Sequence, residues 1–284
     1  MCYFGVLFMQ HHDDTIIIYL ESPNLFNIFV IMKNMKLMYL GDIHGNFNLI
    51  HQYVKKYDIN DAHIIQVGDF GVGFTTFEKE KRMLEMYHTQ LVKNNVHVWA
   101  IRGNHDYKPY FDNDPFGFTN IHLVADYTVL NLSDKNILCI GGAISVDREW
   151  RYTKKQKLGI FENHTLGVES WWPDEVFVLD EEKIKDLRDI NIMVTHTCPD
   201  YCPPNNTFNL GPFVEGIIKD TGDIELRTDL LFERNQVTQA FSIVKMNNDI
   251  EYAYYGHFHR NDDITMYGTK HRLLGVGELW EERD

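Results

Sequence analysis

Side chains that bind metal ions occur in short groups along this 284-residue sequence, each directly after an apolar run. The groups are Asp42 with His44, Asp69, Asn104 with His105 and Asp106, His196, and His257 with His259. A set of carboxylates, imidazoles and one amide, without thiolates, suits Mn, Fe or Zn ions and is too rich in nitrogen for a Ca or Mg site. The residue types therefore predict a transition-metal centre.

Seven of these residues are candidate metal ligands, namely Asp42, His44, Asp69, Asn104, His196, His257 and His259. Seven ligands are too many for one ion and suit two ions that share a carboxylate, and Asp69, alone in its group, is the natural bridge. Two divalent cations would lower the pKa of a water molecule between them, so that a bridging hydroxide attacks phosphorus at neutral pH. We expect Mn as the metal, with Fe or Zn as alternatives.

Residues beside these ligands suggest roles in catalysis. His105 follows a ligand but is not needed to complete the coordination of the two ions. We therefore expect it to be the general acid for the leaving oxygen, with Asp106 fixing its tautomer. Arg102 is placed to hold a phosphate oxygen. Arg148 and Arg151 are either a clamp for a second phosphate or two surface arginines.

The apolar runs before the groups predict the fold. They cover residues 37–40, 64–67, 96–101, 192–194 and 252–255 and show no polar alternation, which is typical of strands buried on both faces. Helical patterns follow the first two groups, so strands and helices alternate. Open α/β sheets bind ligands at the carboxyl ends of their strands. We therefore expect an α/β (α+β) fold with the metal centre at that end.

The rest of the chain indicates a second sheet and a closing segment. Three short β-type runs between residues 121 and 140 predict a meander in the second sheet, and residues 224–246 predict a helix. Residues 199–222 are rich in Pro, Asn and Gly and too long for an ordinary connection, so we expect them to be functional or mobile. Residues 264–280 predict a closing hairpin.

Composition and charge exclude some functions. The formal net charge of −14 at pH 7 disfavours a sequence-independent grip on nucleic acid, which depends on Lys and Arg. No apolar run is long enough to span a bilayer, and the apolar start lacks the basic residues of a signal peptide. The four cysteines show no framework spacing, which indicates a reducing compartment. We therefore expect a cytoplasmic protein without a membrane partner.

The five groups together resemble the motifs of the calcineurin-like metallophosphoesterases. The matching stretches are Gly41-Asp42-Ile43-His44-Gly45, Gly68-Asp69, Gly103-Asn104-His105-Asp106, His196 and Gly256-His257-Phe258-His259. The resemblance implies a two-sheet β-sandwich flanked by helices, with a dinuclear centre between the sheets. It implies that one metal ion is bound by Asp42, His44, Asp69 and His259, and the other by Asp69, Asn104, His196 and His257. It also supports the roles given to His105 and Asp106.

Details of these motifs bear on the substrate. Arg102 before Gly103 resembles the protein Ser/Thr phosphatases, in which an arginine at this place holds phosphate. Those enzymes also carry Asp-Arg-Gly after the second motif, where this chain has Gly71-Val72-Gly73, and they have Glu where it has Asp106. The closing Gly-His-x-His pair is more similar to the phosphodiesterase and nucleotidase branches.

These features favour a phosphomonoesterase that acts on phosphoprotein or nucleotide, so the expected partner is a phosphate ester. The alternatives are a phosphodiesterase or nuclease and a dinucleoside polyphosphate hydrolase, although the acidic charge counts against a nuclease. A non-catalytic scaffold is a further alternative, but here every ligand position is filled. The expected phosphoesterase domain covers residues 35–284, while residues 1–34 are either an extension of the reading frame or an extra hairpin at a sheet edge.

Several other side chains have a simpler interpretation. Five further histidines are expected to be core or surface residues, namely His51, His63, His97, His122 and His271. Cys198 and Cys202 follow His196, but without a second cysteine pair they lack the ligands of a tetrahedral zinc site. Trp171 and Trp172 could stack on a nucleotide base, and we expect at least one of them in the core.

Overall fold

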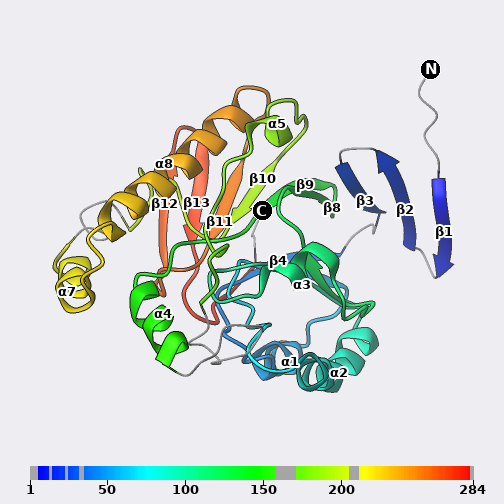
Figure 1. The fold of residues 1–284 in the computed structure, drawn as a ribbon. Coiled ribbons are helices and arrows are strands. Elements are labelled where there is room, and N and C mark those ends of the chain that lie inside the picture. Colours follow the sequence, from blue (N-terminus) through cyan, green and yellow to red (C-terminus); the bar gives the residue numbers. More distant parts are fainter. Residues whose placement is uncertain are drawn as a thin grey trace.

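Two mixed β-sheets face each other in the computed structural model, which describes residues 6–12, 15–22, 25–31, 35–157, 171–204 and 211–281 (Figure 1). The five-stranded sheet has the order β14 (Leu279–Glu281), β4 (Lys36–Leu40), β5 (Ala62–Gln66), β6 (Val96–Ile101) and β7 (Ile121–Val124). The nine-stranded sheet has the order β1 (Val6–His12), β2 (Thr15–Ser22), β3 (Leu25–Ile31), β8 (Thr128–Leu132), β9 (Lys135–Ile140), β10 (Ile192–Thr195), β11 (Tyr252–Tyr255), β13 (Thr269–Leu273) and β12 (Asp262–Met266). This architecture confirms the predicted fold class.

Helices cover the outer faces of both sheets (Figure 1). The described helices are α1 (Asn48–Lys56), α2 (Phe77–Lys93), α3 (Lys108–Asn113), α4 (Arg148–Lys157), α5 (Glu181–Ile184), α7 (Pro212–Thr221) and α8 (Leu226–Lys245). Apolar residues of α1 and α2, such as Ile50 and Leu84, pack against the five-stranded sheet. Apolar residues of α8, such as Val237 and Phe241, pack against the nine-stranded sheet. Each helical layer covers the outer face of its sheet, so the inner faces of the two sheets can pack against each other.

A continuous apolar core fills the space between the sheets. Tyr39 and Ile65 of the five-stranded sheet belong to the same buried cluster as Ile137, Val194 and Tyr254 of the nine-stranded sheet. The ring of Tyr39 stacks on that of Tyr254, with centroids 3.5 Å apart. Because these strands have apolar contacts on both faces, their sequences lack the polar alternation of a solvated sheet.

The carboxyl ends of the central strands meet at one place. β4, β5 and β6 are parallel to one another, and so are β9, β10 and β11 in the other sheet. The imidazole Nδ1 of His196, after β10, lies 2.8 Å from the carbonyl oxygen of Val67, after β5. The backbone N–H of Gly256, after β11, donates to the carbonyl of His196 at 3.1 Å. The loops that carry the predicted ligands are therefore joined across the two sheets.

The predicted meander between residues 121 and 140 is wrong for its first strand. Residues 121–124 form β7 at the edge of the five-stranded sheet, parallel to β6, with Ile121 opposite Val98. Only β8 and β9 pair as an antiparallel hairpin in the nine-stranded sheet. The reason is the connection through α3, which packs on β7 and returns the chain to a parallel neighbour. A four-residue apolar run does not itself reveal which sheet it will join.

The last three strands divide between the two sheets. β12 and β13 form an antiparallel hairpin at the edge of the nine-stranded sheet, which confirms part of the hairpin predicted for residues 264–280. β14 instead pairs antiparallel with β4 in the other sheet. Just before this strand, the N–H of Gly277 donates to the carbonyl of Asp42 at 2.8 Å, and the N–H of Gly41 donates to the carbonyl of Glu278 at 2.9 Å. β14 therefore holds the first ligand loop in place.

The N-terminal strands β1, β2 and β3 extend the nine-stranded sheet beside β8, where Phe29 pairs with Asn131 (Figure 1). This position corresponds to the edge hairpin considered for residues 1–34, while the division into 1–34 and 35–284 stays a prediction. None of the described helices combines the length and apolar character that a membrane crossing requires.

Two predictions concern the region around α7 and α8. The helix expected at residues 224–246 is confirmed as α8, although Leu231, expected on its buried stripe, is 39% exposed. The segment 199–222, expected to be functional or mobile, contains α7, and residues 205–210 lie outside the described part of the chain.

Candidate metal centre

Four of the predicted ligands form one compact cluster, made of Asp42, His44, Asp69 and His259. One ligand atom from each of these residues lies within 4.8 Å of all the others. Nε2 of His259 is 3.0 Å from Nε2 of His44 and 3.4 Å from Oδ2 of Asp42. Two imidazole nitrogens that face each other beside carboxylate oxygens can surround one cation.

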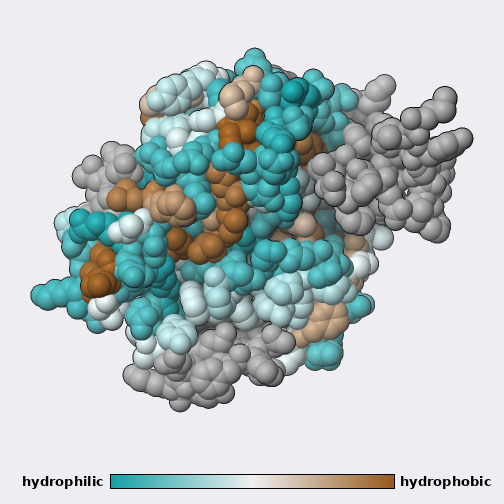
Figure 2. Space-filling view, turned by 45° about the horizontal axis from the view of Figure 1, so that its top comes forward, coloured by the Kyte–Doolittle hydropathy of each residue, from teal (hydrophilic) through white to brown (hydrophobic). Residues whose placement is uncertain are grey.

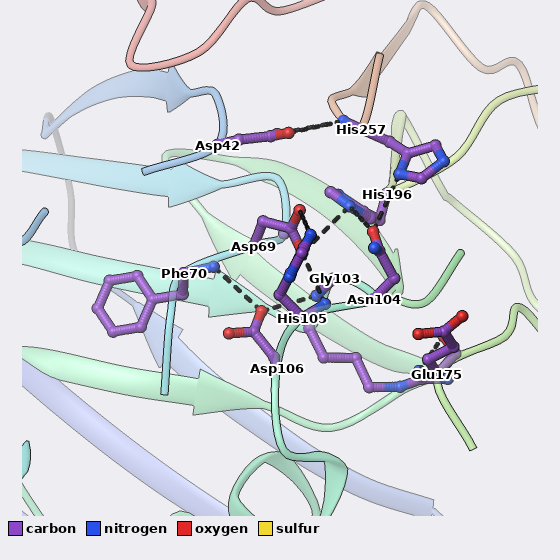
Figure 3. A network of polar contacts seen from close by, with 12 residues as sticks. Asp42, Asp69, Phe70, Gly103, Asn104, His105, Asp106, Glu175, His196 and His257 are labelled. Carbon is purple, nitrogen blue, oxygen red and sulfur yellow. Dashed lines mark hydrogen bonds and ion pairs between the residues drawn. The ribbon is translucent and has the colours of Figure 1, made fainter. Parts of the chain in front are cut away.

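Three further predicted ligands converge beside this cluster (Figure 3). Oδ1 of Asn104 lies 3.1 Å from Nε2 of His196 and 2.9 Å from Nδ1 of His257. These side chains come from the loops after β6, β10 and β11, so residues far apart in sequence meet at one point. An amide oxygen and two imidazole nitrogens form a second set of candidate ligand atoms next to Asp69.

Asp69 lies between the two ligand sets. Its Oδ2 is 3.8 Å from Nδ1 of His44, and its Oδ1 is 3.5 Å from Nε2 of His196. The side chain is 1% exposed, so water does not compete for these oxygens. Each oxygen of one carboxylate therefore faces a different ligand set, which is the geometry expected of a bridging ligand.

The backbone around the ligands adopts rare conformations. Four candidate ligands have positive φ, namely His44 at 46°, Asp69 at 56°, His257 at 68° and His259 at 53°. Such left-handed conformations are unfavourable for residues other than glycine and concentrate at functional sites. A Cβ atom added at Gly103 would lie 2.1 Å from Oδ1 of Asp69, so only glycine allows this carboxylate to approach the loop.

A buried chain of hydrogen bonds orients the amide of Asn104. Its Nδ2 donates to Oγ of Ser145 at 2.8 Å, and this hydroxyl donates to Oε2 of Glu175 at 2.8 Å. Glu175 also accepts from the backbone N–H of Ser145 at 2.7 Å. The chain fixes the amide nitrogen away from the centre and leaves Oδ1 facing the imidazoles. Neither Ser145 nor Glu175 belongs to a motif, so the sequence alone does not single them out.

Burial and mutual contact shift the pKa values of these groups in opposite directions. Burial, with a contribution from Asp69, raises the pKa of Asp42 to about 7 despite the opposing effect of His196. Burial alone would raise the pKa of Asp69, but His196 and other histidines hold it well below its usual value. Burial alone would lower the pKa of His196, but Asp69 raises it to about 9. Protons and cations therefore compete for the same atoms.

His105 is held between a candidate ligand and an arginine. Its backbone N–H donates to Oδ1 of Asp69 at 3.0 Å, and its carbonyl accepts from Nε1 of Trp172 at 3.0 Å. Nη1 of Arg151 lies 2.6 Å from its ring Nδ1. Nη2 of the same arginine lies 3.3 Å from ring Nε2, so the guanidinium lies against both ring nitrogens. Burial lowers the pKa of this imidazole.

The structure does not bring the carboxylate of Asp106 to the ring of His105. Instead this carboxylate accepts from the backbone N–H group of Phe70 at 3.0 Å (Figure 3) and from that of Gly71 at 2.6 Å. It also accepts from the N–H groups of Val72 at 3.1 Å and Gly103 at 2.8 Å. Asp106 therefore ties the loop after β5 to the loop after β6. We revise its expected role from fixing a tautomer to holding these loops.

The guanidinium of Arg102 also serves the structure of the loops. Arg102 is 2% exposed, and its Nε donates to Asp126 at 2.9 Å. Its other nitrogens donate to the carbonyl oxygens of Asp174, Glu175 and Val176 at 2.9–3.2 Å. It is absent from the described lining of the cavity beside the metal centre. These contacts leave no support for the predicted role of Arg102 in holding phosphate.

Arg148 and Arg151 separate in the structure. Arg148 donates from Nε to Asp223 at 2.7 Å and from Nη2 to Asp229 at 2.6 Å, so it links α4 to the start of α8. Arg151 lies one turn further along α4, pairs with Asp147 at 2.7 Å, and reaches the cavity. Of the two predicted phosphate clamps, only Arg151 is placed beside the candidate ligands.

A cavity of about 490 Å³ opens beside the metal centre. Its described lining includes five of the residues singled out from the sequence as ligands or catalytic groups, namely Asp69, Asn104, His105, His257 and His259. The volume lies within the range of roughly 300–1,000 Å³ that is typical of small-molecule sites. These five residues are therefore accessible to a ligand of this size.

The residues given a simpler interpretation are not part of the metal-competent cluster. Among the described residues, the metal-competent cluster contains neither a cysteine nor any of the five further histidines. Cys198 and Cys202 are buried and free, and Nη2 of Arg234 lies 3.4 Å from Sγ of Cys198. Trp172 is 5% exposed, which confirms that at least one of the two tryptophans belongs to the core.

Residues 35–261 match the family model of the calcineurin-like phosphoesterases. No curated protein matches the chain. Similar solved structures include a putative 5'-nucleotidase from Staphylococcus aureus, at 13% identity and a TM-score of 0.45 over 87% of this chain and 52% of that one. GAP50 of Plasmodium matches at 14% identity and a TM-score of 0.40, over 85% and 71% of the two chains. Phosphopantetheinyl hydrolase of Mycobacterium tuberculosis matches at 13% and 0.41, over 85% and 89%. This chain spans about half the length of the nucleotidase.

Proposed function

We propose that this chain, which belongs to the calcineurin-like phosphoesterase family, is a metal-dependent phosphomonoesterase. The observation that carries the proposal is the convergence of two ligand sets that share Asp69. An imidazole, that of His105, and a guanidinium, that of Arg151, lie beside them at the same cavity. This combination suits transfer of a phosphoryl group from an ester to water.

The donor set fits two divalent cations. One would be held by Asp42, His44, Asp69 and His259, and the other by Asp69, Asn104, His196 and His257. Nδ1 of His44 is buried without a hydrogen-bond partner among the described residues, as expected of a ring in a metal site. When bound, the two ions would neutralise phosphate oxygens and lower the pKa of a water molecule, which supplies a nucleophile at neutral pH. Mixed oxygen and nitrogen donors favour Mn, with Fe or Zn as alternatives.

Arg151 is the residue best placed to bind the phosphate group. Its guanidinium offers several donors in one plane, which matches the oxygens of a phosphate. It lies on the cavity wall, in contact with the ring of His105 at 2.6 Å. The pairing with Asp147 fixes its Nε at 2.7 Å and leaves the terminal nitrogens on the side of the ring. Arg151 would therefore orient the ester relative to His105.

His105 would donate the proton that the leaving oxygen needs. Its Nε2 lies 3.9 Å from Oδ2 of Asp69, so this ring nitrogen is on the side of the candidate ligands. Burial lowers the pKa of the ring, whereas the negative charge of a bound phosphate ester would raise it. In the balanced reaction, the water oxygen bonds to phosphorus, the ester P–O bond breaks, and the leaving oxygen takes a proton. The products are an alcohol and inorganic phosphate.

The charge of the cavity counts against nucleic acids and dinucleoside polyphosphates as substrates. Arg151 is the single Lys or Arg among the described residues that line it. Nucleic acids and dinucleoside polyphosphates carry several negative charges and are bound by several cations. A non-catalytic scaffold is disfavoured because the seven predicted ligands lie together rather than being replaced.

Removal and return of metal test the proposal. Protein stripped by a chelator should lose turnover of an aryl phosphate, and Mn²⁺ should restore it better than Fe²⁺ or Zn²⁺. An aryl phosphate diester assayed in parallel should be a poor substrate. Undiminished turnover by fully demetallated protein would rule out the dinuclear assignment, and a preference for the diester would rule out the monoesterase.

A further inference from the structure

An apolar wall adjoins the candidate phosphate end of the cavity. Besides the candidate ligands, His105, and the pair of Asp147 with Arg151, the described lining includes Val146, Phe213, Val214, Ile217, Leu230 and Phe258. These side chains come from the loop after β9, from α7 and α8, and from the loop after β11. The cavity therefore has one polar part and one apolar part.

The packing of α7 explains how this wall is built. Val214 is 2% exposed and belongs to a buried cluster with Ile144, Leu226 and Leu230, so it anchors α7 to the start of α8. Its neighbour Phe213 is 64% exposed although it lines the cavity. Figure 2 shows hydrophobic residues gathered on the side of the molecule where α7 and α8 lie. An exposed aromatic ring at the edge of a concave site is typical of a surface that binds a ligand.

The charges of the lining restrict what can occupy the apolar part. Asp147 and Arg151 pair with each other at 2.7 Å, and the remaining charged or titratable residues of the lining belong to the phosphate end. A charged leaving group placed against Phe213 and Ile217 would lose hydration without gaining a partner. An uncharged, compact group matches the wall.

We propose that the site accepts phosphate monoesters of compact apolar alcohols, alkyl or aromatic, whose leaving group packs against Phe213 and Ile217. This inference rests on the phosphomonoesterase function proposed above and narrows its substrate class. It excludes polyphosphates and esters with a charged leaving group as the preferred substrates. Binding of the apolar group would place the ester oxygen between the wall and the polar end, where His105 lies.

Binding of non-hydrolysable analogues tests the wall without relying on turnover. Calorimetry with the Mn²⁺-loaded protein would compare methylphosphonate, butylphosphonate, 2-phenylethylphosphonate and the polar 3-hydroxypropylphosphonate. Burial of the added carbon atoms should make butylphosphonate bind about tenfold more tightly than methylphosphonate, and phenylethylphosphonate at least as tightly as butylphosphonate. The hydroxypropyl compound should resemble the methyl one. Equal affinities across the series would overturn the inference.

Two matched variants locate the effect. Phe213→Ala should weaken binding of the phenylethyl compound about tenfold and that of the methyl compound less. Phe232→Ala is the control, because Phe232 of α8 is exposed to 62%, nearly as much as Phe213, but does not line the cavity. It should bind the whole series as the parent protein does. If both variants behave alike, the wall is not where the apolar group binds.

Turnover separates this inference from the function on which it rests. Methyl and butyl phosphate have leaving groups of similar acidity, so chemistry alone should not distinguish them. A higher kcat/KM for butyl phosphate supports the inference. Equal values, with both esters hydrolysed, overturn the inference and leave the phosphomonoesterase standing. If no monoester is hydrolysed, the proposed phosphomonoesterase function is wrong. The phosphonate series then tests only whether an apolar group binds at the wall.

Discussion

Histidines gather at both ends of the five-stranded sheet, in two different environments. At the carboxyl ends of its strands, imidazoles lie among the carboxylates of Asp42 and Asp69. At the amino ends of β5, β6 and β7, His63, His97 and His122 surround Trp99 instead. Nε1 of Trp99 donates to Nδ1 of His63 at 3.1 Å, and the rings of Trp99 and His122 stack with centroids 4.0 Å apart.

The pKa values of two equally buried histidines show the difference between these environments. His63 and His196 are both 0% exposed. Burial, together with neighbouring histidines, lowers the pKa of His63 to about 3, whereas contact with Asp69 raises that of His196 to about 9. Burial alone therefore keeps an imidazole neutral as a packing unit. A neighbouring carboxylate raises the affinity of the same ring for a proton. By the same negative charge, it favours a bound cation.

Removal of the shared carboxylate is expected to have the largest effect. Asp69→Asn should reduce metal content and lower turnover of every ester roughly 10⁴-fold, because charge stabilisation by two ions would be lost. His97→Asn, at the other end of the sheet, is the control and should keep its metal. Elemental analysis and turnover assays measure both quantities. If Asp69→Asn retains two ions, metal binding at the carboxyl ends of the strands does not depend on this carboxylate.

Replacement of His105 tests an imidazole that lies at the carboxyl ends of the strands but is not a predicted ligand. His105→Ala should keep its metal and lower turnover of an alkyl phosphate roughly 10²- to 10⁴-fold. The loss should be smaller for nitrophenyl phosphate, whose leaving group hardly needs a proton. In Asp106→Asn, by contrast, any loss should be equal for both esters, because this carboxylate binds backbone N–H groups. Loss of metal by His105→Ala would make His105 a ligand.

The predicted roles that failed show where sequence reasoning stops. The seven ligand positions could be read from residue types after apolar runs, because parallel strands deliver their carboxyl ends to one edge. The structure brings all seven together, and their role as ligands stays a prediction. Arg102 could not be assigned in this way, since its partners lie 24 to 74 residues further along the chain.

Long-range contacts limit the prediction of the fold in the same way. The period of an apolar run indicates a buried strand but not its partner, so β7 was expected in the wrong sheet. Ser145 and Glu175 orient Asn104 only after the loop following β9 has packed beside the centre. The apolar wall of α7 likewise depends on how Val214 docks against α8. Each of these features arises from packing between distant segments.

Acid should destabilise the amino end of the sheet through its neutral histidines. Above pH 6.5 His63 is neutral in both the folded and the unfolded chain. As the pH falls below 6.5, the unfolded form takes up a proton that the folded form, with a pKa of about 3, refuses. Stability contributed by neutral His63 is therefore lost between about pH 6.5 and pH 3. In His63→Asn, whose amide oxygen can still accept from Trp99, this loss should be absent.

Urea unfolding of chelated protein at pH 7 and pH 5 measures this difference. The fall in the free energy of unfolding between the two pH values should be smaller in His63→Asn by about 1–2 kcal/mol. Chelation removes any contribution of bound metal from both proteins. The same pH dependence in both proteins would mean that His63 is accessible to protons in the folded state.

Deletion of residues 1–34 is expected to have the smallest effect. The first ligand loop follows β4, which begins at Lys36 and pairs with β5 and β14 rather than with the N-terminal strands. Protein that begins at Met35 should keep its metal content and its turnover within about a factor of two. Gel filtration and the aryl phosphate assay test this. Insoluble or inactive protein would show that β1, β2 and β3 are an integral part of the nine-stranded sheet.

The pairing of β14 with β4 has a consequence for how the protein is made. The loop of Asp42 is held by hydrogen bonds from Gly277 and to Glu278, more than 230 residues later in the chain. During synthesis, which proceeds from the N-terminus, the first ligand loop is complete long before the segment that fixes it leaves the ribosome. Contacts at such sequence separation form late. Metal should therefore be captured only after β14 has left the ribosome and paired with β4.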